Sequence, residues 1–128
     1  MSKGIADSIV RIPCSVDGKF FRYWIQFLQP FHHLTDREMD IITVFLKTRY
    51  ELSKVISDEE ILDNVTMNED TKRKIREECG ISLPHFQVVM SKFKRNNVIV
   101  DGKINPRYIP KIKEENGSFK LMLFFEFS

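Results

Sequence analysis

The sequence predicts an α+β fold, mostly helical, and three observations carry that prediction. Apolar residues recur at helical spacing between capping signals over residues 20–97. An Asp-Gly pair at 101–102 lies between two short apolar runs, which is a strong hairpin signal. Residues 118–127 alternate in the manner of a strand. With 128 residues, of which 42% are hydrophobic, the chain is long enough to bury the core of one domain.

The N-terminal part predicts a strand followed by an aromatic helix. Residues 8–16, "SIVRIPCSV", predict a short strand that Pro13 confines to a sheet edge, and Asp17-Gly18 predicts a turn. The stretch "FFRYWIQFLQPFHHL" then predicts a helix that begins at Phe20 and stops near Pro30. On that helix the large apolar residues form two stripes, Phe21, Trp24, Ile25 and Leu28 on one, and Phe20, Tyr23, Phe27 and Phe31 on the other.

A surface helix needs only one apolar stripe to face its own core. The second stripe therefore predicts a contact with another protein, because exposed apolar patches mark interaction sites. The alternative, which stays open here, is that the chain's own two terminal strands cover both stripes.

Four further helices are predicted from their end signals. Thr35 and Glu38 form a capping box, followed by Met39, Ile42, Phe45 or Leu46, and Tyr50 at helical spacing. Ser57 and Glu60 form a second box that opens a short helix through Leu62. Asn68 caps the next helix and Gly80 ends it; Ser82 begins the last helix, with Pro84 in its first turn.

The last two helices and the stretch after them have the order of a helix-turn-helix unit with a wing. The helices are separated by "CGIS", and the Asp101-Gly102 hairpin follows directly. Residues 105–117 then predict a loop, and "SFKLMLFFEF" a final strand. The residues expected between the two crossing helices are Ile75, Cys79, Ile81, Phe86 and Val89. One face of the final strand carries Phe119, Leu121, Leu123, Phe125 and Phe127, and the other carries Met122 and Phe124, which we expect at a protein interface.

Residues 71–105, "TKRKIREECGISLPHFQVVMSKFKRNNVIVDGKIN", resemble a winged helix-turn-helix domain, and the broader pattern runs over residues 34–104. Arg76 departs from it, since this family usually has a small residue there. The stretches "HHLTDREMD", "ECGISLPHF" and "VDGKINPRYIP" also resemble small proteins of tailed bacteriophages of the crAss-like group. The resemblance implies a virion role or a regulatory role. The expected organisation is one domain over residues 1–128: strand and aromatic helix in 1–33, a winged core in 34–104, and loop and strand in 105–128.

The charge is divided unevenly along the chain. Residues 34–70 carry four basic and ten acidic side chains, whereas residues 71–113 carry eleven basic and three acidic ones. The basic half predicts an acidic partner, either nucleic acid or the acidic half of another copy. If the partner is DNA, base contacts would come from Ser82, His85, Gln87 and Ser91, and phosphate contacts from Lys72, Arg73, Lys92, Lys94, Arg95 and the wing residue Lys103.

No pattern of an active site is found in the sequence. It lacks a Gly-rich phosphate loop, a metal-binding motif and a nucleophile elbow. His32, His33 and His85 are expected at helix ends or on the surface. Cys14 and Cys79 are expected to be reduced and mostly buried, and two cysteines are too few for a Cys-based zinc site. We therefore expect no catalytic residue, no metal and no cofactor.

These observations lead to two expectations of function. The first is a structural subunit of a tailed-phage virion, of the ring or head–tail connector type, that uses a winged-helix fold to dock onto protein. The alternative is a winged-helix DNA-binding protein, either a transcriptional regulator or a packaging or replication factor. The expected partners are other proteins or further copies of the chain, with duplex DNA as the alternative; neither a membrane nor a small-molecule substrate is expected. The expected location is the host cytoplasm, followed by assembly into the virion.

Overall fold

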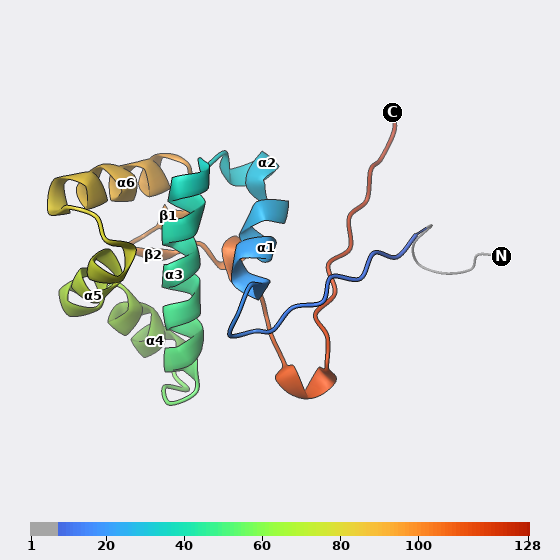
Figure 1. Cartoon of the computed structure of the whole chain (residues 1–128), viewed down its shortest axis with the longest axis horizontal. Helices are drawn as coiled ribbons and strands as arrows, with labels where there is room; N and C mark the ends of the chain where they lie inside the picture. The colour runs from blue at the N-terminus through green and yellow to red at the C-terminus, as the bar shows by residue number, and fades with distance from the viewer. Residues whose placement is uncertain (1–7) are drawn as a thin grey trace.

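The computed structural model describes residues 8–128, and within them six helices and one small antiparallel sheet form the body (Figure 1). The predicted α+β class is confirmed at this level. The elements are α1 Phe20–Phe27, α2 Gln29–His32, α3 Asp36–Ser53, α4 Glu59–Thr66, α5 Glu69–Cys79, α6 Leu83–Arg95, β1 Ile99–Val100 and β2 Lys103–Ile104, followed by 3-10 turns at Pro106–Tyr108 and Glu114–Asn116.

The helix ends follow the predicted capping signals with one shift. Thr35 and Glu38 exchange both bonds of the capping box at the start of α3. Asn68 caps α5 and Ser82 caps α6. The prediction for α4 was wrong at both ends, because the Asp58 carboxylate and not Ser57 accepts a hydrogen bond from the Ile61 amide, at 2.9 Å, and the helix runs to Thr66 instead of ending at Leu62. Carboxylate and hydroxyl are both good N-caps, so adjacent candidates compete.

The long helix α3 occupies the centre of the body and organises the core. Helices α1 and α2 lie on one side of it, and α4, α5 and α6 lie on the other (Figure 1). Phe45 of α3 is fully buried; its ring stacks on Phe86 and meets Phe93 edge to face, both from α6. Phe21 and Ile25 of α1 are buried in the same cluster. The apolar stripe of α3 thus joins the two sides of the body into one core.

Polar bonds fix the elements that surround α3. The Trp24 indole N–H donates to the Tyr108 carbonyl at 2.9 Å, which ties α1 to the turn after the hairpin. Arg49 of α3 and Asp63 of α4 form a half-buried ion pair at 3.0 Å. These bonds connect residues far apart in the sequence, so they set the angle at which the outer elements pack.

The sheet is a two-stranded hairpin, in which Ile99 lies opposite Ile104 and Val100 opposite Lys103. Asp101 and Gly102 both have positive φ, as the predicted tight turn requires. Ile99 and Ile104 are buried on one face, whereas Val100 and Lys103 are exposed. The predicted hairpin is therefore confirmed, with one face packed on the core.

The two predicted terminal strands are absent, and both predictions were wrong. Residues 8–15 and 118–128 run as extended chain with no strand pairing, and neither segment takes part in a backbone–backbone hydrogen bond with another described residue, save the Ser15 carbonyl. The sheet holds only β1 and β2 within the described residues, and neither segment pairs with it. Both segments leave the helical body on the same side (Figure 1). We call residues 8–15 the N-terminal arm and residues 118–128 the C-terminal arm.

The turn between α5 and α6 depends on Gly80, which has φ +65° and ends α5 in the left-handed region. A Cβ at this position would meet no other atom within 4 Å, so only the backbone conformation is strained by a side chain. We expect Gly80→Ala to lower the free energy of unfolding by about 1 kcal/mol. Gly80→Asn is the control and should cost less, since Asn tolerates this region. Urea titration measures both, and equal losses would contradict this account of the turn.

Candidate interaction surfaces

The first candidate surface is the exposed side of α6 with the hairpin beside it. His85, Gln87 and Ser91 are exposed, as a reading helix would require, and Ser82 is exposed but uses its hydroxyl to cap α6. Leu83 and Val88 are also more than half exposed on this helix. Its N-terminal half therefore offers apolar groups as well as polar ones to a partner.

Three of the six basic side chains predicted for phosphate contacts are engaged in ion pairs on the protein itself. Lys72 pairs with Glu69 at 2.8 Å, and Arg73 pairs with Asp70 and lies near Glu77. These pairs on α5 are exposed to solvent. The carboxylates of Glu69, Asp70 and Glu77 lie beside these cations on α5, so they weaken the attraction of this helix for an anion.

Lys92 is engaged more firmly, because it reaches Glu38 on α3 at 3.2 Å. Partial burial works to raise the pKa of Glu38, but the hydrogen bonds from the Thr35 amide and from Lys92 outweigh it and hold that pKa below its ordinary value. The Lys92 ammonium thus helps to join α6 to the start of α3. Among the predicted phosphate contacts, Lys94, Arg95 and Lys103 are exposed and form no ion pair within residues 8–128.

The second candidate surface is the aromatic side of α1 and α2. Phe20 and Trp24 meet the ring of Phe119 edge to face, with centroids 5.2 and 5.3 Å apart. The chain's own C-terminal arm therefore covers the start of the second stripe. Phe27 is 48% exposed and Phe31 is 55% exposed, so the stripe stays open toward α2. We call this open pair the helix patch.

Phe20 and Tyr23 are half-buried, so of the predicted interface residues on α1 and α2 the exposed ones are Phe27 and Phe31. The predicted pair on the C-terminal arm is open as well, with Met122 50% and Phe124 71% exposed.

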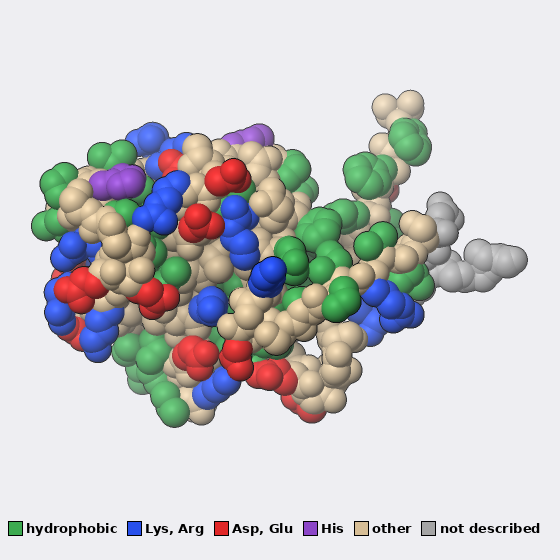
Figure 2. Space-filling model, viewed as in Figure 1, with side chains coloured by type: hydrophobic (Ala, Val, Ile, Leu, Met, Phe, Trp, Pro, Cys, Tyr) green, Lys and Arg blue, Asp and Glu red, His purple; other side chains and the backbone are tan. Residues whose placement is uncertain are grey.

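The arms carry the largest apolar side chains in open solvent. Phe125 and Phe127, predicted to share one face of a final strand, are exposed over 81% and 97% of their surface. Ile9 and Val10 of the N-terminal arm are similarly exposed. In the space-filling view, charges of both signs are mixed over the helical body, whereas hydrophobic side chains gather over the projecting segments (Figure 2). Sequence analysis did not name Phe125, Phe127, Ile9 and Val10 as surface residues, because it placed them in terminal strands that the structure does not form.

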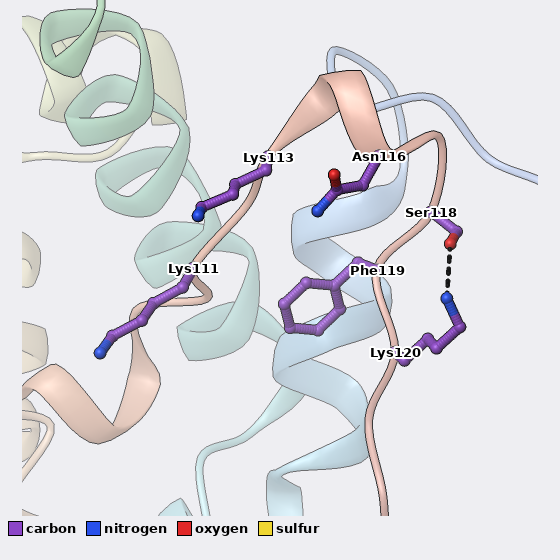
Figure 3. A pocket seen from close by; sticks show the side chains of 6 residues that line it. All are labelled: Lys111, Lys113, Asn116, Ser118, Phe119 and Lys120. Carbon is purple, nitrogen blue, oxygen red and sulfur yellow. Dashed lines mark hydrogen bonds between the residues drawn. The ribbon is translucent and has the colours of Figure 1, made fainter.

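A hollow of about 470 Å³ lies at the base of the C-terminal arm, lined by Lys111, Lys113, Asn116, Ser118, Phe119 and Lys120. Lys111 and Lys113 point away from Lys120, whose ammonium bonds the Ser118 hydroxyl at 3.1 Å (Figure 3). Phe119 turns toward α1. The three ammonium groups do not converge, so the hollow is not built to hold an anion.

The histidines and cysteines lie partly where the sequence predicted. His33 and His85 are exposed, whereas His32 is the last residue of α2, which agrees with a helix end, but it is fully buried and not on the surface. Cys14 is exposed and Cys79 half-buried, so the prediction of two mostly buried thiols was wrong for Cys14. Within residues 8–128, no three His, Cys, Asp or Glu side chains gather closely enough to hold a metal ion.

No helix in the described part of the chain is long and apolar enough to cross a membrane. Comparison with protein-family models, with curated proteins and with solved structures gives no match to this chain.

Proposed function

We propose that this protein is a non-enzymatic structural subunit that docks onto protein through its apolar arms and helix patch. The observation that carries the proposal is the exposure of Phe124, Phe125 and Phe127 on an extended segment that has no backbone partner. Segments that stay in solvent are poor in aromatic residues, whereas this one is rich in them. An unpaired apolar strand is a ready template for pairing with another chain.

The body supports docking better than sequence-specific DNA reading. Its α5–turn–α6–hairpin order fits the winged helix-turn-helix arrangement that the sequence resembles. However, Lys72, Arg73 and Lys92 are paired with carboxylates on the protein. The pairs on α5 and the Lys92–Glu38 pair thus leave Lys94, Arg95 and Lys103 as the unpaired cations among the predicted phosphate contacts, and the helical body serves as the module that carries the arms.

The assignment to a tailed-phage virion rests on the resemblance of the sequence to small proteins of crAss-like phages. A ring or head–tail connector subunit located in the host cytoplasm before assembly would need such docking arms. Mass spectrometry of purified particles from the genome that encodes the chain tests this assignment. We expect the protein in the particles at a fixed copy number. Its absence from particles, with normal expression in the infected host, would overturn the assignment.

A DNA-binding role is the second candidate, and one observation favours it. Lys94 and Arg95 at the end of α6 and Lys103 on β2 are exposed and unpaired within residues 8–128, on adjoining elements of the winged unit. Such cations could contact phosphates beside the groove that α6 enters. Under this role the protein would be a regulator or a packaging or replication factor.

Light scattering with and without duplex DNA at moderate salt separates the two roles. For the structural subunit we expect the mass to stay the same when DNA is added. For the DNA-binding role, the mass would rise when DNA is added. Replacing Lys94, Arg95 and Lys103 by Gln would then lower the affinity for DNA, and the slope of log K against log salt concentration would fall by the amount expected for about three phosphate contacts. Lys72→Gln is the matched control, since Lys72 is already paired with Glu69. Equal loss in the control would contradict the assignment of the unpaired cations.

A further inference from the structure

The C-terminal arm and the helix patch are two apolar surfaces that one chain leaves open at once. Phe124, Phe125 and Phe127 are exposed on the arm, and Phe27 and Phe31 are exposed on α1 and α2. We propose that the arm of one copy packs on the helix patch of a second copy, in a head-to-tail contact. This inference deepens the proposed function, because it rests on the docking role and names the partner as another copy of the same chain.

The contact already begins within one chain. Phe119, at the base of the arm, packs edge to face on Phe20 and Trp24 of α1. Phe27 follows Phe20 by seven residues on α1, so the two side chains lie on the same helix face, and Phe31 lies on α2, which follows directly. A side chain of the arm therefore already packs on this aromatic surface within one chain. A second copy carries the same arm and can supply it to the part of the surface that stays open.

The arm leaves its own body after Phe119. The Lys120 ammonium bonds the Ser118 hydroxyl, and the exposed fraction rises from 41% at Leu121 to 97% at Phe127. An extended chain rises about 3.3 Å per residue, so the nine residues after Phe119 span about 30 Å. That reach is long compared with the eight-residue helix α1, about 12 Å in length. The arm can thus reach across to a neighbouring body.

The exposed apolar area is large enough for a stable contact. A Phe side chain offers about 150–250 Å² when fully exposed, so the open apolar residues of the arms and helix patch present on the order of 1,000 Å² per chain. A typical monomer has a largest apolar patch of roughly 300–600 Å². A standard protein–protein interface buries about 800 Å² per partner. A contact between the arm of one copy and the patch of another would remove apolar area of this size from water.

One arm and one patch on each chain make a heterologous contact, since the two surfaces differ. Such contacts propagate, and they close into a ring when the rotation between copies permits it. The copy number of the assembly follows from that rotation.

Two variants that each lose one surface test the contact. The arm variant carries Phe124→Ser, Phe125→Ser and Phe127→Ser, and the patch variant carries Phe27→Ser and Phe31→Ser. All five positions are about half exposed or more, so the body should fold in both. By light scattering we expect the wild-type chain to assemble beyond its mass of 15.2 kDa and each variant alone to remain at that mass.

An equimolar mixture of the two variants gives the decisive reading. It retains one intact patch and one intact arm, so we expect complexes of twice the chain mass that grow no further. Val55→Ser with Ile61→Ser is the matched control, because both side chains are exposed and lie outside the arms, the helix patch and the exposed side of α6, and it should assemble like the wild type.

Several outcomes overturn the inference. A patch variant that assembles alone would mean that arms pair with each other. A wild-type monomer would mean that the arm folds onto its own chain or awaits a different protein. Failure of the inference is distinguishable from failure of the proposed function: a monomeric chain that is still found in purified particles rejects only the head-to-tail contact, whereas assembly in solution by a chain absent from particles rejects only the virion assignment.

Discussion

Replacing Phe45 by Ala is expected to lower the free energy of unfolding by about 3–5 kcal/mol, the range for a large aromatic removed from a packed core. Phe45 is 0% exposed, and its ring lies 6.2 Å from that of Phe86 and 6.4 Å from that of Phe93, between centroids. Its removal leaves a cavity where α3 meets α6, and both aromatic neighbours lose contacts. Urea denaturation followed by circular dichroism measures the change.

Phe31→Ala is the matched control for Phe45→Ala. It removes the same atoms from a side chain that is 55% exposed, so in the monomer we expect a loss of about 1 kcal/mol or less. Similar losses in the two variants would contradict the placement of the core around α3.

Acidification is expected to destabilise the protein through His32, the one histidine that is buried. Burial lowers the pKa of His32 from its ordinary value of 6.5; the bond to the Ile25 carbonyl works to raise it, and nearby His33 and Arg22 lower it further. The unfolded chain therefore takes up this proton at higher pH than the folded chain. The stability is fully present above pH 6.5 and falls as the pH drops below it, by up to about 1.4 kcal/mol per pH unit.

The two hydrogen bonds of the His32 ring require the neutral form of the imidazole. Its Nδ1 accepts from the Leu34 amide at 3.0 Å, so Nε2 carries the proton and donates to the Ile25 carbonyl at 2.8 Å. A second ring proton on Nδ1 would face that amide and break the bond. His32→Gln removes the titrating group, and we expect its stability to change less than that of the wild type between pH 7 and 5. Equal pH profiles in urea titrations would contradict this role. His85→Gln, at an exposed position that is not among the groups acting on His32, should leave the wild-type profile unchanged.

The sequence predicted those parts of the fold that a few neighbouring residues determine. The Thr35 capping box, the Gly80 helix end and the Asp101-Gly102 turn are complete within four residues, so local chemistry suffices to place them. The terminal strands failed because a strand needs an edge to pair with. Alternation over residues 119–127 shows that the chain can be a strand, but not that a partner edge exists.

The candidate sites show the same division between local and distant determinants. Exposure of Phe27, Phe31 and Phe124 agrees with the predicted surface, since excess apolar residues are visible in the sequence. The pairing of Lys92 with Glu38 joins residues 54 positions apart, so a count of charges could not reveal it. Burial of His32 depends on Ile25 and Leu34 lying around it, which an adjacent pair of histidines does not indicate.

Trp24 is the single tryptophan of the chain, and its indole bridges two parts of the molecule. Its N–H donates to the Tyr108 carbonyl, and its ring meets Phe119 at the base of the C-terminal arm. When excitation is set at a wavelength that the three tyrosines do not absorb, intrinsic fluorescence therefore comes from one emitter with two contacts. Unfolding of the body breaks the hydrogen bond, whereas release of the arm exposes the ring face alone. Phe119→Ala should shift the emission to longer wavelength in the folded protein, so one optical signal can follow arm seating without any label.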